Sequence, residues 1–379
     1  MLSYQICKRC VMDSSDPDIV FDEDGVCHHC HEHLAALAKH VDHGDEGEAK
    51  LAALVDEIKR RGQGKENDCI IGVSGGVDST YVAWLTVKLG LRPLAVHVDN
   101  GWNSDIAVRN IHRFIEKLGI NLYTEVFDWE QFKEIQRAFL LASVPDVEIP
   151  TDHMVWAAMF RIAAQRKIPY IISGTNHQTE SHLPHGWSRG HRDAGYIKAI
   201  HKAHGSRPIG KLPVSSFATF VEHMTKGMNV IPILDYVDYS REEALDVIQR
   251  EVGWQDYGGK HHESVFTRWY QGCYLPRKFG YDKRRTHLSS LISTGEISRD
   301  EALAALQPPP YDEDRQDEDC VYVAKKLGFT TAEFDAIMKA PPKRFEDFDS
   351  YLKRINSPMF QALRTARKAI RKRLGAEAA

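Results

Sequence analysis

Apolar positions between residues 70 and 174 follow two alternating periods. The run IIGV at 70–73 is short and rich in β-branched residues, as in a strand buried on both faces of a parallel sheet. From 77 to 89, apolar residues recur at steps of three and four, which is typical of one helix face. The pattern continues with predicted strands at 91–98, 121–127 and 169–174 and predicted helices at 104–118, 130–141 and 151–167. Strands separated by helices indicate the α/β class with a doubly wound parallel sheet.

The first predicted strand leads into the sequence SGGVDS, residues 74–79, before the first predicted helix. Unpaired backbone N–H groups and the helix dipole point at one spot there, which favours an anion. Gly75 and Gly76 allow the close backbone approach that such a loop needs. We therefore expect a phosphate-binding loop, although not a Walker A loop, because no Gly-Lys-Ser/Thr follows. The plainer alternative is a glycine turn with an aspartate N-cap.

SGGVDS resembles the PP-loop of the ATP pyrophosphatases, which NAD, GMP and asparagine synthetases share with tRNA thiolases. The resemblance implies cleavage of ATP between its α and β phosphates, so that AMP is transferred to a substrate oxygen. It also implies that Ser74, Gly75, Gly76 and Ser79 bind pyrophosphate and that Asp78 helps to hold Mg²⁺. Ser74 and Asp78 are accordingly the first candidate catalytic residues.

Two further polar stretches follow predicted strands, where ligands of doubly wound sheets bind. Asp99 comes after the second strand and is a candidate for nucleotide binding. GTNHQTE, residues 174–180, resembles a loop of the NAD synthetase branch with one residue fewer between Thr and Asn. That likeness implies that Gly174 and Thr175 contact the nucleotide and that Glu180 coordinates Mg²⁺. The alternative is an ordinary turn.

Lys211, in PIGKLPVSSF, is a candidate cation for the departing pyrophosphate and the third candidate catalytic residue. The stretch from 180 to 207 is rich in His, Gly, Arg and Trp and has no clear period. A stretch of this length inside a compact domain is either a functional lid or binding loop, or a disordered insertion. Both alternatives stay open on the sequence.

Four of the seven cysteines have a regular spacing. Cys7, Cys10, Cys27 and Cys30 form two C-x2-C pairs separated by sixteen residues, which is typical of a four-thiolate Zn²⁺ site. We expect the intervening loop to form the hairpin of a zinc ribbon. Disulfides are the alternative, and the lack of a secretory signal disfavours them. The other cysteines, at positions 69, 273 and 320, are isolated in the sequence.

Composition is that of an ordinary globular protein, with 42% apolar and 27% charged residues among 379. No apolar stretch approaches the roughly 20 residues of a membrane span, and MLSYQICKRC lacks a signal-peptide core, so we expect a cytoplasmic enzyme. A net charge of −4 makes a nucleic-acid partner unlikely. Basic residues gather in KFGYDKRR and in RTARKAIRKR, which is more typical of a solvated helix face.

Three capping-box patterns, at 240–243, 298–301 and 330–333, predict a mostly helical end of the chain. We therefore divide the chain into a zinc-binding ribbon at 1–45, a PP-loop nucleotide-binding domain at 46–235 and a helical C-terminal region at 236–379.

The cysteine ribbon precedes SGGVDS in the chain and contains the sequence CVMDSSDPDIVFDEDGVCHHC. This ribbon resembles that of the N-acetyl sugar amidotransferases of surface polysaccharide and pseudaminic acid biosynthesis. KFGYDKRRTHLSSLISTGEISRDEAL resembles their C-terminal segment. The resemblance implies that ATP activates the amide oxygen of a nucleotide-linked N-acetyl sugar and that ammonia then attacks, giving an acetamidino sugar for lipopolysaccharide O-antigen or a related glycan. It further implies that a separate glutaminase and a cyclase-like subunit supply the ammonia.

The cysteines agree with an external ammonia source. A glutaminase needs a nucleophilic cysteine at its N-terminus or in a triad, whereas residue 2 is Leu and both Cys7 and Cys10 belong to the zinc pattern. Two other functions remain as alternatives. A tRNA thiolase would need catalytic cysteines or a cluster, and a non-catalytic nucleotide-binding regulator would leave Asp78 and Glu180 without a role.

Overall fold

The computed structural model describes residues 4–42, 44–225, 227–259 and 262–355. Its five parallel strands form one sheet in the order β3-β2-β1-β4-β5, which confirms the predicted α/β fold class. The strands are β1 (Cys69–Gly72), β2 (Pro93–Asp99), β3 (Asn121–Val126), β4 (Tyr170–Ser173) and β5 (Asn229–Pro232). The short edge strand β5 is absent from the pattern-based prediction.

The strand order reverses between β1 and β4. From β1 the chain adds β2 and β3 on one side, and then β4 and β5 on the other. Ile70 of β1 is paired with Leu94 of β2 and with Ile171 of β4. Ligands of doubly wound sheets bind at such a reversal, beyond the carboxyl ends of the strands. SGGVDS and GTNHQTE follow β1 and β4, and therefore meet there.

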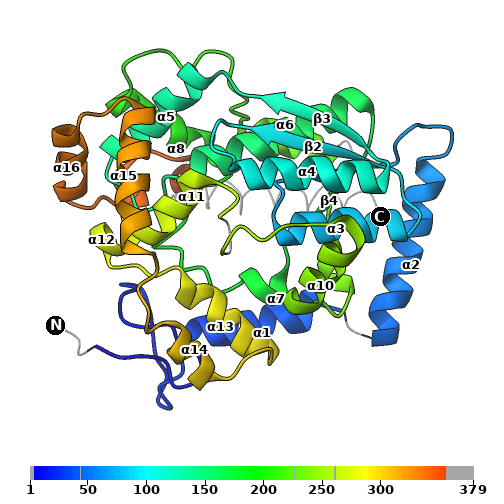
Figure 1. The fold of residues 1–379 in the computed structure, drawn as a ribbon, viewed down its shortest axis with the longest axis horizontal. Coiled ribbons are helices and arrows are strands. Elements are labelled where there is room, and N and C mark those ends of the chain that lie inside the picture. Colours follow the sequence, from blue (N-terminus) through cyan, green and yellow to red (C-terminus); the bar gives the residue numbers. More distant parts are fainter. Residues whose placement is uncertain (1–3, 43, 226, 260–261, 356–379) are drawn as a thin grey trace, which may run out of the picture.

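Helices cover both faces of the sheet (Figure 1). One face packs against α2 (Gly44–Arg61), α3 (Val77–Lys88), α4 (Asp105–Leu118) and α10 (Arg241–Val252), and the other against α6 (Ile149–Arg166). Ile71 points to the first face and Ile70 to the second, and both are fully buried. Burial on both faces explains why β1 is a continuous apolar run. Cys69 is buried in the same strand, and its burial raises the pKa of its thiol.

The C-terminal part is mostly helical, as predicted. Its elements are α11 (Val265–Trp269), the π-helix η2 (Tyr270–Tyr274), α12 (Leu275–Phe279), α13 (Arg284–Thr294), α14 (Arg299–Ala305), α15 (Glu313–Leu327), α16 (Thr331–Lys339), the 3-10 turn η3 (Phe345–Asp347) and α17 (Tyr351–Ile355). Ser298 and Thr330 form the expected capping boxes, whereas Ser240 caps α10 through the Glu243 N–H. The basic run RTARKAIRKR lies outside the described residues.

The remaining elements are α1 (His28–His40), α5 (Trp129–Leu141), α7 (His177–Glu180), α8 (Ala194–His204), α9 (Phe217–Thr225) and the 3-10 turn η1 (Ile233–Tyr236). The 180–207 stretch is not a disordered insertion, because α8 lies in its second half and packs against α5, and its role as a lid or binding loop stays a prediction. Tyr196, Ile197 and Ile200 of α8 are buried in the core that α8 shares with α5. Polar His and Lys residues between these positions hide the helical period in the sequence.

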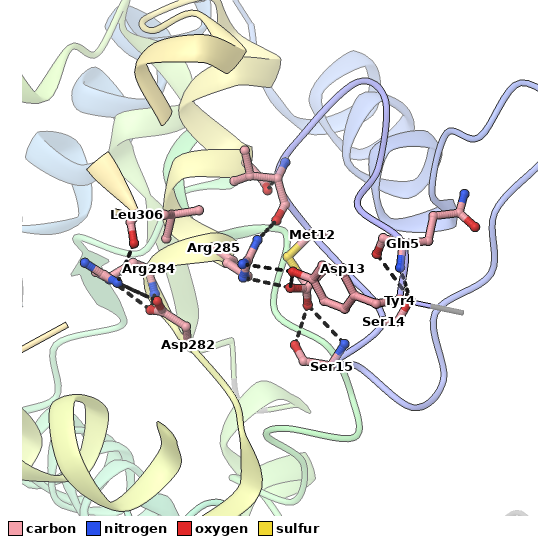
Figure 2. A network of polar contacts seen from close by, with 12 residues as sticks. Tyr4, Gln5, Met12, Asp13, Ser14, Ser15, Asp282, Arg284, Arg285 and Leu306 are labelled. Atoms are coloured by element: carbon pink, nitrogen blue, oxygen red, sulfur yellow. Dashed lines mark hydrogen bonds and ion pairs between the residues drawn. The ribbon is translucent and has the colours of Figure 1, made fainter. Parts of the chain in front are cut away.

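The cysteine-bearing N-terminal segment docks on the C-terminal helices, beside α13 and α14 (Figure 1). Arg285 of α13 donates to the Val11 carbonyl at 2.7 Å and pairs with Asp13 at 3.0 Å (Figure 2). Asp13 also accepts hydrogen bonds from Tyr4 at 2.7 Å and from Ser15. The N-terminal segment is therefore joined to α13 by charged contacts. In the described part of the chain, no helix is long and apolar enough to cross a bilayer.

Candidate active site and metal centre

The SGGVDS loop makes a tight turn between β1 and α3. Gly75 has φ of +81°, and a Cβ there would lie 2.5 Å from the Ala107 carbonyl oxygen, so only glycine fits. The buried Trp254 indole N–H donates to the Gly75 carbonyl at 2.9 Å and holds the turn. Gly76 is the N-cap residue of α3 and Asp78 lies in its first turn. The aspartate N-cap of the plainer alternative is therefore not what forms.

Two serine hydroxyls of the loop lie side by side. Ser74 Oγ accepts the Gly76 N–H at 3.2 Å and lies 3.2 Å from Ser79 Oγ. Ser79 Oγ also donates to the Gly76 carbonyl. Hydroxyls and backbone N–H groups at a helix N-terminus are suited to bind an anion such as pyrophosphate.

A pocket of about 240 Å³ opens beside this loop, at the reversal of the strand order. It is lined by Ser74, Gly76, Val77, Asp78, Ser79, Gly174, Thr175, Glu180, Arg241, Tyr257 and Glu263. Seven of the predicted site residues are therefore brought together from the ends of β1 and β4. Because small-molecule pockets usually measure roughly 300–1,000 Å³, this one accommodates part of a nucleotide, such as its phosphates.

Besides Val77 of the loop itself, sequence reasoning missed three residues of this lining: Arg241, Tyr257 and Glu263. Arg241 is the first residue of α10, inside a stretch that the sequence presents only as a capping box. Glu263 accepts a hydrogen bond from Ser74 Oγ at 3.4 Å although 189 positions separate the two residues. Nothing near Tyr257 or Glu263 in the sequence marks them as partners of the loop.

Three carboxylates, those of Asp78, Glu180 and Glu263, line the pocket together with the Arg241 guanidinium. Carboxylate oxygens beside a phosphate-binding loop are the ligands that Mg²⁺ prefers, so the residues fit this ion. The Tyr239 hydroxyl donates to Asp78 Oδ1. Burial, and then the charge of Asp78, raise the pKa of Tyr239, so this hydroxyl keeps its proton and stays a donor.

Gly75, Asp99 and Lys211 lie outside the pocket lining. Asp99 Oδ1 accepts the Gly101 N–H at 2.8 Å and shapes the turn after β2. Lys211 has an exposed side chain, and its backbone N–H donates to Gln131 Oε1 at 2.8 Å. PIGKLPVSSF therefore contacts α5 and does not line the pocket at the PP-loop. The proposed roles of these residues stay predictions.

Cys7, Cys10, Cys27 and Cys30 form one buried cluster. The Sγ atoms lie 3.9 Å apart for Cys7 and Cys30, 3.6 Å for Cys10 and Cys27, and 3.7 Å for Cys27 and Cys30. Four sulfurs at about 2.3 Å from one tetrahedral ion are about 3.8 Å from each other, so the donor set and its spacing fit Zn²⁺. The expected ribbon hairpin is reduced to two isolated bridges, at Ile6 and Asp13 and at Phe21 and Cys27.

The two cysteines of the C-terminal region lie close together in space, although they are far apart in the sequence. Cys273 Sγ lies 3.2 Å from Cys320 Sγ, between η2 and α15. Neither lines the PP-loop pocket. His182 and Trp187 of the 180–207 stretch are fully buried, and Trp187 packs against the cysteine cluster.

Comparison with known proteins divides the chain into two matched parts. The NAD synthase family model matches residues 48–200. The family model described as LPS biosynthesis protein WbpG-like, C-terminal domain, matches residues 263–364. The pocket is built from both parts, because the second match begins at Glu263.

Single proteins match less of the chain. A glutamine-hydrolysing GMP synthase from Pyrobaculum aerophilum is 37% identical over 76 residues, which are 20% of this chain and 15% of that protein. The structure of NMN synthetase from Francisella tularensis covers 69% of this chain and 97% of its own, with 16% identity and a TM-score of 0.34. That structural likeness is too distant to support an inference about activity.

Proposed function

Because the chain belongs to the family of PP-loop amidotransferases of lipopolysaccharide biosynthesis, we propose that it converts the N-acetyl group of a nucleotide-linked sugar into an acetamidino group. The reaction uses ATP and ammonia and releases AMP and pyrophosphate. One observation carries the proposal: the PP-loop, in the NAD synthase-like part, shares its pocket with Glu263 of the WbpG-like part. A pocket with walls from both parts suits a reaction between a nucleotide and a sugar.

The chemistry needs two steps, because an amide oxygen is a poor leaving group until it is adenylated. In the first step the amide oxygen attacks the α-phosphorus, the O–P bond forms, and the bond to pyrophosphate breaks. In the second step ammonia attacks the imidate carbon, and the C–O bond breaks with its electron pair going to AMP. Orientation of the reactants and neutralisation of charge supply most of the rate.

In the first step, each group of pocket residues has a proposed role. Backbone N–H groups of the loop, with the hydroxyls of Ser74 and Ser79, bind the departing pyrophosphate. Asp78 and Glu180, with Glu263, would hold Mg²⁺, whose chemistry here is to neutralise phosphate charge. Arg241 adds a fixed positive charge to the same pocket.

In this proposal the role of Zn²⁺ is structural. The cysteine cluster is buried and already has four sulfur donors, so an ion there has no open position for a substrate. We infer that Zn²⁺ holds the N-terminal segment in the shape that docks on α13 and α14.

The test measures AMP release with a panel of UDP- and CMP-linked N-acetyl sugars, with ammonium chloride as the nitrogen donor. We expect one sugar to support formation of AMP and of an amidine product in equal amounts. If none of the sugars stimulates AMP release and added tRNA does, the proposal is overturned in favour of a thiolase.

The source of ammonia needs its own experiment. We propose that separate glutaminase and cyclase-like subunits supply it, because the four N-terminal cysteines are held in the cluster and neither Cys273 nor Cys320 lines the pocket. The isolated chain should use ammonium salts, and should use glutamine only when those partners are added. Efficient glutamine-dependent turnover by the purified chain alone would contradict this part.

A further inference from the structure

Helix α10 and the residues on either side of it lie against the PP-loop. We call residues 237–257 the α10 segment. Neither family model covers this segment, because the NAD synthase match ends at residue 200 and the WbpG-like match begins at residue 263. Helix α10 packs against α3, the helix that follows the loop. The α10 segment therefore adds contacts to the site that neither match describes.

The C-terminal end of the α10 segment is fixed to the loop and to α4. The Trp254 indole N–H donates to the Gly75 carbonyl at 2.9 Å, inside the turn of the loop. The Asn110 side chain of α4 donates to the Gln255 carbonyl at 2.8 Å and accepts the Gln255 N–H at 2.9 Å. Asn110 and Trp254 are both buried. These hydrogen bonds hold the end of α10 at one place beside the PP-loop.

At the other end of the α10 segment, Tyr239 contacts α3 at two points. Its hydroxyl donates to Asp78 Oδ1, and its ring lies 5.6 Å from the ring of Tyr81, measured between centroids. Tyr81 follows Asp78 by three positions, so both side chains lie on one face of α3. Tyr239 is only 5% exposed. Packing of the ring therefore fixes where the hydroxyl meets the Asp78 carboxylate.

The backbone on both sides of Tyr239 is also held. Asp235 of η1 is buried, and its Oδ1 accepts the His177 N–H at 2.8 Å, from the GTNHQTE stretch after β4. Ser240 is the N-cap residue of α10 and accepts the Glu243 N–H. Tyr239 lies between these two anchors. A side chain held by such supports is a preorganised donor.

The hydrogen bond from Tyr239 restricts the carboxylate of Asp78. Tyr239 is the one side-chain partner of Asp78 among the residues that the structure describes. Asp78 is half-buried and lines the pocket. Its carboxylate would otherwise turn easily about the Cβ–Cγ bond, because that torsion has broad energy wells. With Oδ1 engaged by Tyr239, the carboxylate offers Oδ2 to a cation in one orientation.

We propose that Tyr239 is a positioning residue, which orients the Asp78 carboxylate toward the Mg²⁺ that accompanies ATP. The inference rests on the proposed function, because it takes Asp78 as a ligand of that ion. Tyr239 does not line the pocket, so it acts through Asp78 and not on a substrate. Loss of a partner that orients a metal ligand lowers metal affinity about 10–100-fold.

The test measures binding of Mn²⁺ together with α,β-methylene-ATP, which cannot be cleaved between its α and β phosphates. Mn²⁺ favours the same oxygen ligands as Mg²⁺ and has an electron paramagnetic resonance signal that depends on its ligands. In Tyr239→Phe, which removes one hydroxyl group, we expect the Kd for the Mn²⁺–nucleotide complex to rise about 10-fold and the signal of the bound ion to change. Tyr81→Phe keeps the ring that packs against Tyr239 and is the matched control, with wild-type values for both.

A double variant separates positioning from a general effect on the pocket. In the Asp78→Asn chain, Tyr239→Phe should change neither the Kd nor the signal any further, because Tyr239 acts through the Asp78 carboxylate. Additive losses in the double variant would overturn the inference. A lower thermal midpoint of Tyr239→Phe with unchanged metal binding would also overturn it, and so would a raised Kd with an unchanged signal.

The binding measurements need no sugar, so failure of the proposed function looks different. If the wild-type chain binds the Mn²⁺–nucleotide complex but no sugar supports AMP release, the sugar reaction is wrong and the role of Tyr239 is still decided by the variants. If the wild-type chain does not bind the complex, the inference and the PP-loop assignment are both overturned.

Discussion

The cysteine cluster and the PP-loop pocket both begin from short sequence patterns, but they are completed in different ways. All four sulfurs of the cluster come from residues 7–30, and their side chains lie in one buried group. The pocket starts from six consecutive residues, whereas Arg241, Tyr257 and Glu263 come from positions more than 160 residues further along. Four ligands close together in the sequence can complete a metal site, whereas an open pocket needs walls that the loop alone cannot supply.

Removing the cluster's ligands should have the largest effect. The wild-type chain should bind one Zn²⁺, and the double variant Cys7→Ser, Cys10→Ser should bind none, because two thiolates no longer complete the shell. The thermal midpoint should fall by several degrees, since the docked N-terminal segment loses its shape. Metal analysis and thermal denaturation measure both effects. Cys320→Ser should keep the metal, and iron in cluster stoichiometry in the wild-type chain would contradict the assignment.

Asp78→Ala, and likewise Ser74→Ala, should reduce AMP formation about 10²–10³-fold, because each removes a group from the anion and metal site while leaving the fold intact. Asp105→Ala is a matched control, since Asp105 occupies the first turn of α4 as Asp78 occupies that of α3, but Asp105 is exposed and does not line the pocket. Pyrophosphate release with the sugar and ammonium present is the measurement. Near-wild-type release in either loop variant would remove the PP-loop assignment.

Glu263→Gln tests the distant wall of the pocket. The change keeps the size of the side chain and removes its charge next to Ser74, so we expect a fall of about 10–100-fold in kcat/KM for ATP, smaller than for Asp78. A rising requirement for added Mg²⁺ should accompany it. Glu296→Gln, at the exposed end of α13, serves as the control. Unchanged kinetics for ATP would show that Glu263 does not contribute to ATP binding or turnover.

Arg299→Ala should have the smallest effect. The Arg299 guanidinium donates to the carbonyls of Cys7, at 2.9 Å, and Cys10, at 3.1 Å, from the start of α14. Loss of these bonds should lower the free energy of unfolding by about 1.5–3 kcal/mol, as for hydrogen bonds made by a charged group. Urea denaturation measures this change, with Arg250→Ala on the exposed face of α10 for comparison. The Zn²⁺ content should stay at one, which separates docking from metal binding.

The sequence by itself determined the features that depend on neighbouring residues. The period of the apolar positions specified the α/β class and most strands, because a strand buried on both faces and an amphipathic helix each need a local pattern. Gly75 and the spacing of the cysteines are local in the same sense, since one follows from a positive φ and the other from the geometry of one ion.

Only the tertiary structure decided which distant residues share a site. Glu263 reaches Ser74, Tyr239 reaches Asp78, and Arg285 reaches Asp13, across 161 or more positions in each case. No periodicity encodes such pairs, because each depends on how separate helices pack around the sheet. The same reason explains why Lys211 lies outside the pocket, and why α8 packs as core in a stretch that looks irregular in the sequence.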